Sequence, residues 1–161
     1  MDTHPNGIGY DDRVGVAAIL HLAETTQQPI GVLLSVGEEI GESSASLLGE
    51  YQRKWFSCAL VLDRWGTTDL VTRVGITRTC SEDFAAMIAE ALRGWGYAPC
   101  LGRQSDVVPL HAAIGDAVNL SVGFYSEHTA TEYVDWEHVE QLPAIISAAL
   151  LSITMREAQR H

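Results

Sequence analysis

The sequence is poor in positive charge, with ten lysines and arginines against 21 aspartates and glutamates and a net charge of −11. Phosphate backbones repel such a chain, and no stripe of lysine or arginine reverses the sign locally. The apolar run near the end, residues 144–153, contains serines and is too short to cross a bilayer. We therefore expect neither nucleic acid nor a membrane as a partner.

The sequence also lacks a cationic stretch that leads into an apolar one, so we expect no signal peptide. Its three cysteines, Cys58, Cys80 and Cys100, show no CxxC spacing. Without a secretion signal, this pattern indicates reduced and mostly buried thiols rather than disulfides or a zinc site. The predicted compartment is the cytoplasm.

No repeat, low-complexity tract or linker divides the chain, so we expect a single domain over residues 1–161. The predicted strands are residues 29–36, 58–62, 70–74 and 117–124. The predicted helices are residues 14–25, residues 43–55, one that Ser81 caps, and one that Asp135 caps and Pro143 kinks or restarts. This alternation favours an α/β fold, a three-layer α/β/α sandwich with a mainly parallel sheet.

The beginning of the chain departs from that fold class. Residues 1–10 form a polar loop that leads directly into a buried helix, whereas domains of this class normally begin with strands. We therefore expect the N-terminal strands of the sheet to be missing.

Acidic residues and one histidine follow the predicted strands. Glu38 and Glu39 come after the first strand, Asp63 after the second, and His128 after the last. The carboxyl ends of strands in open α/β sheets form the ligand crevice. Two further aspartates, Asp11 and Asp12, lie in the loop before the first helix and near the same edge. The sequence thus predicts one cluster of carboxylates with an imidazole.

Each of these patterns has an ordinary explanation when taken alone. A pair of aspartates at a helix start is most often an N-cap, a pair of glutamates a solvated loop, and a single histidine a structural residue. Together, uncompensated carboxylates in an apolar setting would cost several kcal/mol per buried charge. A divalent cation is the usual compensation, and mixed Asp, Glu and His ligands suit zinc, with manganese or cobalt as alternatives.

The motifs GYDDRVG and SVGEEIG, the strand that ends in Leu-Asp, and the stretch NLSVGFYSEH resemble the co-catalytic dizinc exopeptidases. That superfamily includes bacterial leucyl aminopeptidase, tripeptidase T, the tetrahedral aminopeptidases and glutamate carboxypeptidase. The resemblance covers essentially the whole chain. The gap between Asp63 and His128 leaves no room for the lid or dimerisation domain that several subfamilies insert.

The resemblance implies a role for each motif residue. Asp11 corresponds to the carboxylate that bridges two metals, Glu39 and His128 to ligands of the first metal, and Asp63 to a ligand of the second. Glu38 corresponds to the general base that acts on a metal-activated water. The implied supporting residues are Asp12, Arg13, which balances charge, and Glu132, which orients the imidazole of His128. Ser105 and Asp106 resemble a site-lining loop, although an ordinary turn fits them as well.

The chain departs from the superfamily at its first residues. The first metal ligand there is the histidine of an H-x-D motif, and one histidine before Met1 would make Asp2 the orienting aspartate of that motif. Three explanations are open: a late start site or truncation, a short and inactive metal-binding protein, or substitution by His4. We expect one competent metal site and a weak second one, so one or two zinc ions per chain.

The resemblance implies hydrolysis of peptide bonds by an aminopeptidase-like zinc enzyme, with weak or no activity in this chain. One alternative is an N-acyl amino acid deacylase or amidohydrolase on the same scaffold. Another is a binding or structural remnant without catalysis. Missing strands would expose a sheet edge, so we expect homo-oligomers or pairing with a separate N-terminal piece.

Overall fold

The computed structural model describes residues 8–49, 52, 54–103 and 105–159. Its α-helices are α1 (Tyr10–Thr25), α2 (Glu82–Ala91), α3 (Val107–Ile114) and α4 (Trp136–Ala158). Its strands are β1 (Cys58–Arg64), β2 (Asp69–Val74), β3 (Thr77–Arg78), β4 (Ala98–Gly102), β5 (Asp116–Ser121), β6 (Phe124–Tyr125) and β7 (Tyr133–Val134). Three short 3-10 helices are described, η1 (Glu38–Ile40), η2 (Ser44–Leu47) and η4 (Arg93–Trp95).

The main sheet is mixed, and its two longest ladders are parallel. β1 pairs with β5, and β2 pairs with β4, both in parallel. β2 also runs antiparallel to β5 and to the short β3. β6 and β7 form a separate two-stranded ribbon. The strand order places β1 at one end of the sheet, beside β5.

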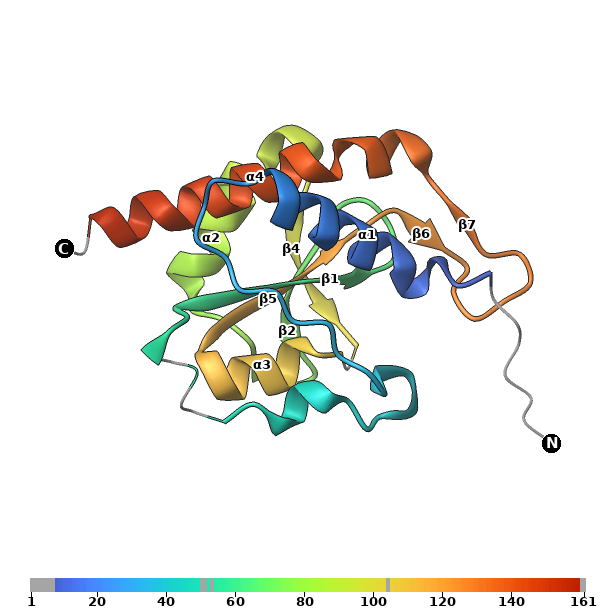
Figure 1. The fold of residues 1–161 in the computed structure, drawn as a ribbon, viewed down its shortest axis with the longest axis horizontal. Helices are drawn as coiled ribbons and strands as arrows, with labels where there is room; N and C mark the ends of the chain where they lie inside the picture. The colour runs from blue at the N-terminus through green and yellow to red at the C-terminus, as the bar shows by residue number, and fades with distance from the viewer. Residues whose placement is uncertain (1–7, 50–51, 53, 104, 160–161) are drawn as a thin grey trace.

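The sheet lies between two layers of helices (Figure 1). Helices α1, α2 and α4 cover one face, and α3 covers the other. The larger core, on the α1 and α4 side, contains Phe84, Ile88, Leu120 and Ile145, each almost fully buried. This arrangement confirms the predicted α/β class and three layers.

Helices α2 and α4 begin at residues whose side chains offer a capping oxygen. The Ser81 hydroxyl accepts a hydrogen bond from the Phe84 amide at 3.3 Å, and Asp135 accepts one from the His138 amide at 3.2 Å. Both predicted N-caps are therefore confirmed. Helix α4 continues through Pro143 as one helix over Trp136–Ala158, which excludes the restart among the two predicted alternatives, a kink or a restart.

Two predicted elements are absent from the described residues. Residues 29–36 form no strand, because no described segment pairs with them, and side chains such as Val32 and Leu34 are about half exposed. Residues 43–55 form no α-helix over their described part, which holds only the 3-10 helix η2 and isolated helical turns. The prediction of a strand over 29–36 was therefore wrong, because a strand needs a neighbour to pair with.

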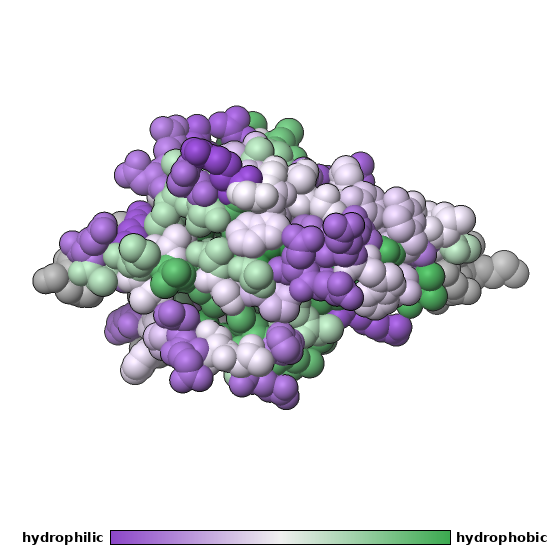
Figure 2. Space-filling view, turned by 90° about the horizontal axis from the view of Figure 1, so that it is seen from above, coloured by the Kyte–Doolittle hydropathy of each residue, from purple (hydrophilic) through white to green (hydrophobic). Residues whose placement is uncertain are grey.

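Of the described helices, α4 alone is long and apolar enough to cross a membrane by length and composition. Its residues Leu142, Ile145, Ile146 and Ala149 are buried in the core of this domain. Core helices of this kind pass the same test, so the length of α4 is weak evidence for a membrane span. The face in Figure 2, seen from above, mixes hydrophobic and hydrophilic surface.

Gly15 sets how closely α1 approaches the edge strand of the sheet. A Cβ at this position would lie 1.9 Å from the Leu62 carbonyl oxygen and 2.5 Å from the Asp12 carboxylate. Only glycine therefore allows α1 to lie directly on β1, which brings Asp12 against the strand that carries Asp63.

We expect Gly15→Ala to lower the free energy of unfolding by about 1–3 kcal/mol, because α1 must move off β1 to admit the methyl group. Urea denaturation followed by circular dichroism measures the change. Gly94→Ala is the matched control: a Cβ at Gly94 has open space around it, so we expect a change within about 0.5 kcal/mol. Equal stability of the two variants would show that α1 packs less closely than described.

Candidate metal centre

Asp11, Glu39 and His128 meet at the start of α1. The His128 Nε2 atom lies 3.0 Å from Asp11 Oδ2 and 2.7 Å from Glu39 Oε2. One ligand atom from each of the three residues lies within 4.8 Å of the others. Side chains separated by up to 117 positions in sequence therefore converge on one point, as the sequence predicted for these three residues.

The GEEIG motif presents its two glutamates on a single turn of 3-10 helix. Gly37 and Gly41 flank the turn with φ values of 82° and 74°, a conformation that glycine adopts without steric cost. A Cβ at Gly37 would also lie 2.7 Å from the Glu42 carbonyl oxygen. The motif thus needs both glycines, and the turn directs Glu39 toward His128.

His128 occupies an unusual backbone position. Its φ is 61°, and that of Ser126 is 56°, so two non-glycine residues of one short loop lie in the left-handed region. Such positions are costly for residues with a Cβ and persist where the surroundings over-determine them. The loop joins β6 to β7, and this strained turn brings the imidazole over Asp11.

Glu132 holds the loop that carries Asp11. The side chain is only 3% exposed. Its Oε2 accepts a hydrogen bond from the Gly9 amide at 2.7 Å, and its Oε1 accepts one from the Asp11 amide at 2.8 Å. We expected Glu132 to orient the imidazole of His128, but both of its oxygens bind the backbone beside Asp11 instead. The residue positions a carboxylate rather than the histidine.

The two residues after Asp11 have local roles. The peptide bond between Asp11 and Asp12 is cis. Asp12 accepts a hydrogen bond from the Gly15 amide at 3.0 Å, which ties it into the first turn of α1. The Arg13 guanidinium donates to the Ile8 carbonyl at 3.1 Å and is exposed. Arg13 therefore holds the entering loop, in place of the charge balance that we expected from it.

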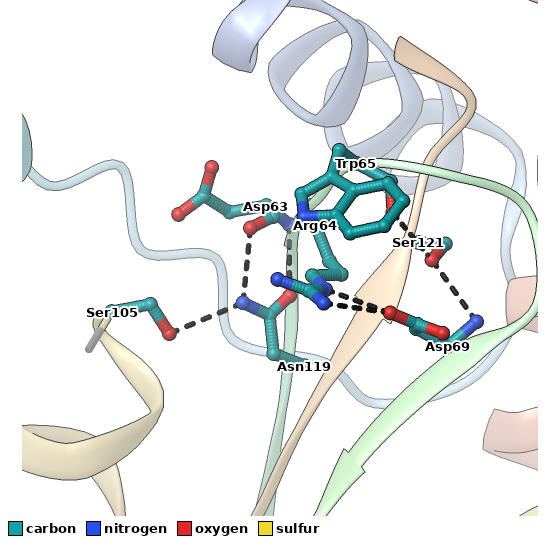
Figure 3. A network of polar contacts seen from close by, with 7 residues as sticks. All are labelled: Asp63, Arg64, Trp65, Asp69, Ser105, Asn119 and Ser121. Atoms are coloured by element: carbon teal, nitrogen blue, oxygen red, sulfur yellow. Dashed lines mark hydrogen bonds and ion pairs between the residues drawn. The ribbon is translucent and has the colours of Figure 1, made fainter. Parts of the chain in front are cut away.

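Asp63 reaches the cluster from the end of β1. Its carboxyl group is hydrogen-bonded to that of Asp11. The β1–β5 register shifts between Val61 and Arg64, a local irregularity that turns the strand at Asp63. Figure 3 shows the Asp63 carboxylate pointing away from Asn119, whose side chain binds the Asp63 backbone, and from Asp69, whose carboxylate binds Arg64. Asp11 thus contacts His128 on one side and Asp63 on the other.

Asn119 is a positioning residue that our sequence reasoning missed. Its amide replaces the backbone pairing lost at the irregularity: Oδ1 accepts from the Asp63 amide at 3.1 Å, and Nδ2 donates to the Asp63 carbonyl at 3.0 Å. Nδ2 also donates to the Ser105 hydroxyl at 3.1 Å (Figure 3). A polar residue within the apolar run AVNLSV was the available signal, because a buried amide needs partners.

Asp106 is buried at the start of α3 and lines the same cavity as Asp11 and Glu38. The Ser35 hydroxyl donates to its Oδ2, whereas its Oδ1 has no hydrogen-bond partner among the described residues. Ser105 binds Asn119 and lies behind it. Asp106 is therefore a site-lining carboxylate, and Ser105 a support.

Burial and mutual repulsion raise the pKa of several carboxyl groups here. Burial, followed by the charge of Glu39, raises the pKa of Glu38 to about 7. Burial raises the pKa of Asp12 to about 8, with Asp11 adding repulsion. The pKa values of Asp11 and Asp63, which share a hydrogen bond, are raised by burial and by neighbouring carboxylates. In the metal-free protein the cluster therefore favours protonation.

The donor set suits a divalent cation. One imidazole nitrogen and two carboxylate oxygens are a ligand set typical of zinc, with manganese or cobalt as alternatives. Among the described residues, the basic side chain that contacts the Asp11 and Glu39 carboxylates is His128. The Arg13 guanidinium binds the Ile8 carbonyl instead. A cation would relieve the repulsion that raises these pKa values. The remaining predicted residues, Asp2 and His4, lie outside the described residues.

The fold is similar to that of two solved structures. PhTET1-12s, solved with a dodecamer in the asymmetric unit, matches with a TM-score of 0.63 and 19% sequence identity. The match covers 87% of this chain and 48% of the PhTET1-12s chain. Aminopeptidase APDkam598 from the archaeon Desulfurococcus kamchatkensis matches with a TM-score of 0.67 and 17% identity, over 88% of this chain and 47% of its own. No family model and no curated protein matches the sequence.

These likenesses confirm the predicted fold. The chain spans about half the length of each of the two proteins. Its residues therefore form one part of an architecture that is larger in those structures.

The metal-free protein should lose stability as the pH rises. Asp12 has a higher pKa when folded than when unfolded, so its contribution is complete at low pH and is lost as the pH rises toward about 8. We expect Asp12→Asn, which keeps an oxygen for the Gly15 amide, to melt increasingly above the wild type between about pH 5 and about pH 8 in EDTA. Differential scanning fluorimetry measures the melting temperatures.

Asp83→Asn is the control, because Asp83 lies on the exposed first turn of α2. Its melting temperature should follow that of the wild type at every pH. A constant difference between Asp12→Asn and the wild type would contradict the raised pKa.

Proposed function

We propose that this chain is the metal-binding part of an aminopeptidase-like peptidase, and that Asp11, Glu39 and His128 hold one divalent cation. The observation that carries the proposal is the convergence of these three ligand atoms within 4.8 Å of one another, from the start of α1, the 3-10 turn η1 and the β6–β7 loop. The fold shared with an aminopeptidase and the resemblance of the DDRVG and GEEIG motifs support it. Zinc suits the donor set best.

A bound zinc ion would supply Lewis-acid polarisation of a scissile carbonyl and a lower pKa for water. Glu38 is placed to handle the proton in such a hydrolysis. It lies next to the ligand Glu39 on the same 3-10 turn, is half-buried, and lines the same cavity as Asp11 and Asp63. We assign its carboxylate the role of general base, accepting a proton from water and returning it to the leaving amine.

The acidic end of the cavity favours substrates with a free amine. Asp106 is buried there with one oxygen that has no partner among the described residues, and its charge is close enough to affect Glu38. A positively charged N-terminus would satisfy that oxygen, whereas an acetylated one would lose the charge. This observation favours an aminopeptidase over the deacylase alternative.

The second metal position is less complete. Asp63 and the shared Asp11 are its ligands among the described residues. Two carboxylates leave a divalent ion short of the four ligands that zinc usually takes. We propose that this chain holds one cation firmly and a second one weakly, with little activity by itself.

The chain without a purification tag should retain about one zinc equivalent after mild dialysis. A variant with one added histidine before Met1 should retain about two, because that histidine restores the missing ligand of the resembled motif. Inductively coupled plasma mass spectrometry measures the stoichiometry. Two firmly held equivalents in the unextended chain would contradict the incomplete second position.

In the extended variant we expect slow hydrolysis of leucine p-nitroanilide, and Glu38→Gln should lower its kcat by about 100-fold or more, since proton transfer is lost. Zinc content should stay unchanged, because Glu38 is not one of the proposed ligands. Glu42→Gln, an exposed residue of the next turn, is the matched control and should keep full activity. Preference for N-acetyl-leucine p-nitroanilide would favour the deacylase, and metal binding without hydrolysis of either would favour the binding remnant.

A further inference from the structure

The loop that carries His128 is closed by a very short ribbon. The loop covers residues 126–132 and joins β6 to β7, which pair at two positions and form a sheet of their own. The His128 side chain is 56% exposed, so packing does little to fix its position. A two-stranded ribbon is at best marginally stable by itself in water. A further interaction is therefore needed to hold the two ends of this loop together.

Two tyrosines face each other at the base of the loop. Tyr125 ends β6, Tyr133 begins β7, and the two are directly opposite in register. Their rings stack, with the centroids 5.0 Å apart and an angle of 9° between the planes. Cross-strand aromatic pairs stabilise hairpins, and the Tyr125 hydroxyl also reaches that of Thr67, before β2, at 3.5 Å. We call this pair the tyrosine stack.

The loop itself holds backbone conformations that need outside support. Ser126 and His128 both have positive φ values, which are costly for residues with a Cβ and persist where the surroundings hold them. Inside the loop, the Thr129 hydroxyl donates to the Ser126 carbonyl at 2.7 Å. At its end, the Glu132 carboxylate accepts from the Gly9 and Asp11 amides. The residue after Glu132 belongs to the tyrosine stack, so opening the stack would loosen this end as well.

We propose that the tyrosine stack positions His128 and thereby sets how tightly the candidate metal centre binds zinc. The inference rests on the proposed function, which makes His128 a metal ligand. With the loop closed, the imidazole already lies beside Asp11 and Glu39, so binding need not order it. Without the stack, the loop opens, and the apparent dissociation constant rises by the inverse of the closed fraction. A loop closed for about a tenth of the time would bind zinc about tenfold more weakly.

The location of the two rings makes this role separable from stability. Tyr133 is 53% exposed, and neither ring belongs to the two hydrophobic cores. Their neighbours Phe124 and Val134 pack in the larger core and attach the ribbon to the domain. Removing a ring should therefore change the closure of the loop far more than the stability of the whole fold.

The first test compares zinc dissociation constants of the whole tag-free chain, measured by competition with a chromogenic chelator. Tyr133→Thr keeps a residue suited to a strand but removes the ring, and it should weaken zinc binding about tenfold. Tyr133→Phe keeps the ring and should bind zinc as the wild type does. Leu101→Thr is the matched control, because Leu101 is 61% exposed on β4, outside the cavity that Asp11 and Glu39 line.

A double-mutant cycle shows whether the two rings act as one unit. Tyr125→Thr alone, and the double variant with Tyr133→Thr, should each weaken zinc binding by about the same factor as Tyr133→Thr, since each removes the same contact. Losses that multiply in the double variant would mean that the rings act independently, which would overturn the inference.

Hydrogen–deuterium exchange in EDTA examines the loop without a metal ion. Exchange at residues 126–132 should be faster in Tyr133→Thr than in the wild type, while exchange in β5 and the urea midpoint stay unchanged. Faster exchange in β5, or a fold lost altogether, would mean that the ring only supports the domain. That result would overturn the positioning role.

The possible failures can be told apart. A wild-type chain that binds no zinc would overturn the proposed function and this inference with it. Zinc binding in the wild type, with the same affinity in Tyr133→Thr, would overturn this inference alone. Equal weakening in Tyr133→Phe would trace the effect to the hydroxyl group and overturn stacking as its cause.

Discussion

The structure around the candidate metal centre depends on crowding carboxylates that repel one another. Asp11 and Glu39 approach within reach of a single ion, Asp63 adds its charge beside Asp11, and burial raises the cost of the charges of Asp11 and Asp63. Hydrogen bonds and backbone conformation hold these groups close together. Glu132 accepts a hydrogen bond from the Asp11 amide, Asn119 binds the backbone of Asp63, and two glycines shape the turn that carries Glu39. The fold therefore holds the carboxylates together against their electrostatic repulsion, and a bound cation would offset that repulsion.

The meeting of Asp11, Glu39 and His128 could be expected from their motifs, although none of them directly follows a strand of the main sheet. The supporting residues could not be assigned as well. Glu132 lies four positions after His128, which suggested contact with the imidazole, yet a strained loop sends its carboxylate to the N-terminal loop instead. Asn119 escaped notice because pattern reasoning saw only an apolar strand. Positioning residues act through backbone groups, and a pattern of side chains carries little information about those.

The segment 29–36 shows a different limit. Its composition is that of a buried strand. Pairing, however, is a property of two segments, and no described neighbour completes the ladder. The same absence explains why Val32 and Leu34 are half exposed although their sequence is typical of an interior. The local pattern therefore predicted neither the pairing nor the burial of this segment correctly.

The hydrogen bonds from Gly9 and Asp11 to Glu132 join positions 123 and 121 residues apart. During synthesis, Asp11 leaves the ribosome long before His128 and Glu132 exist, so the candidate centre assembles only after the chain has been made as far as Glu132. Contacts of such high sequence separation form late and slowly in folding. A metal ion would therefore bind only after residues 9–132 have folded together, and a nascent chain would offer it only scattered carboxylates.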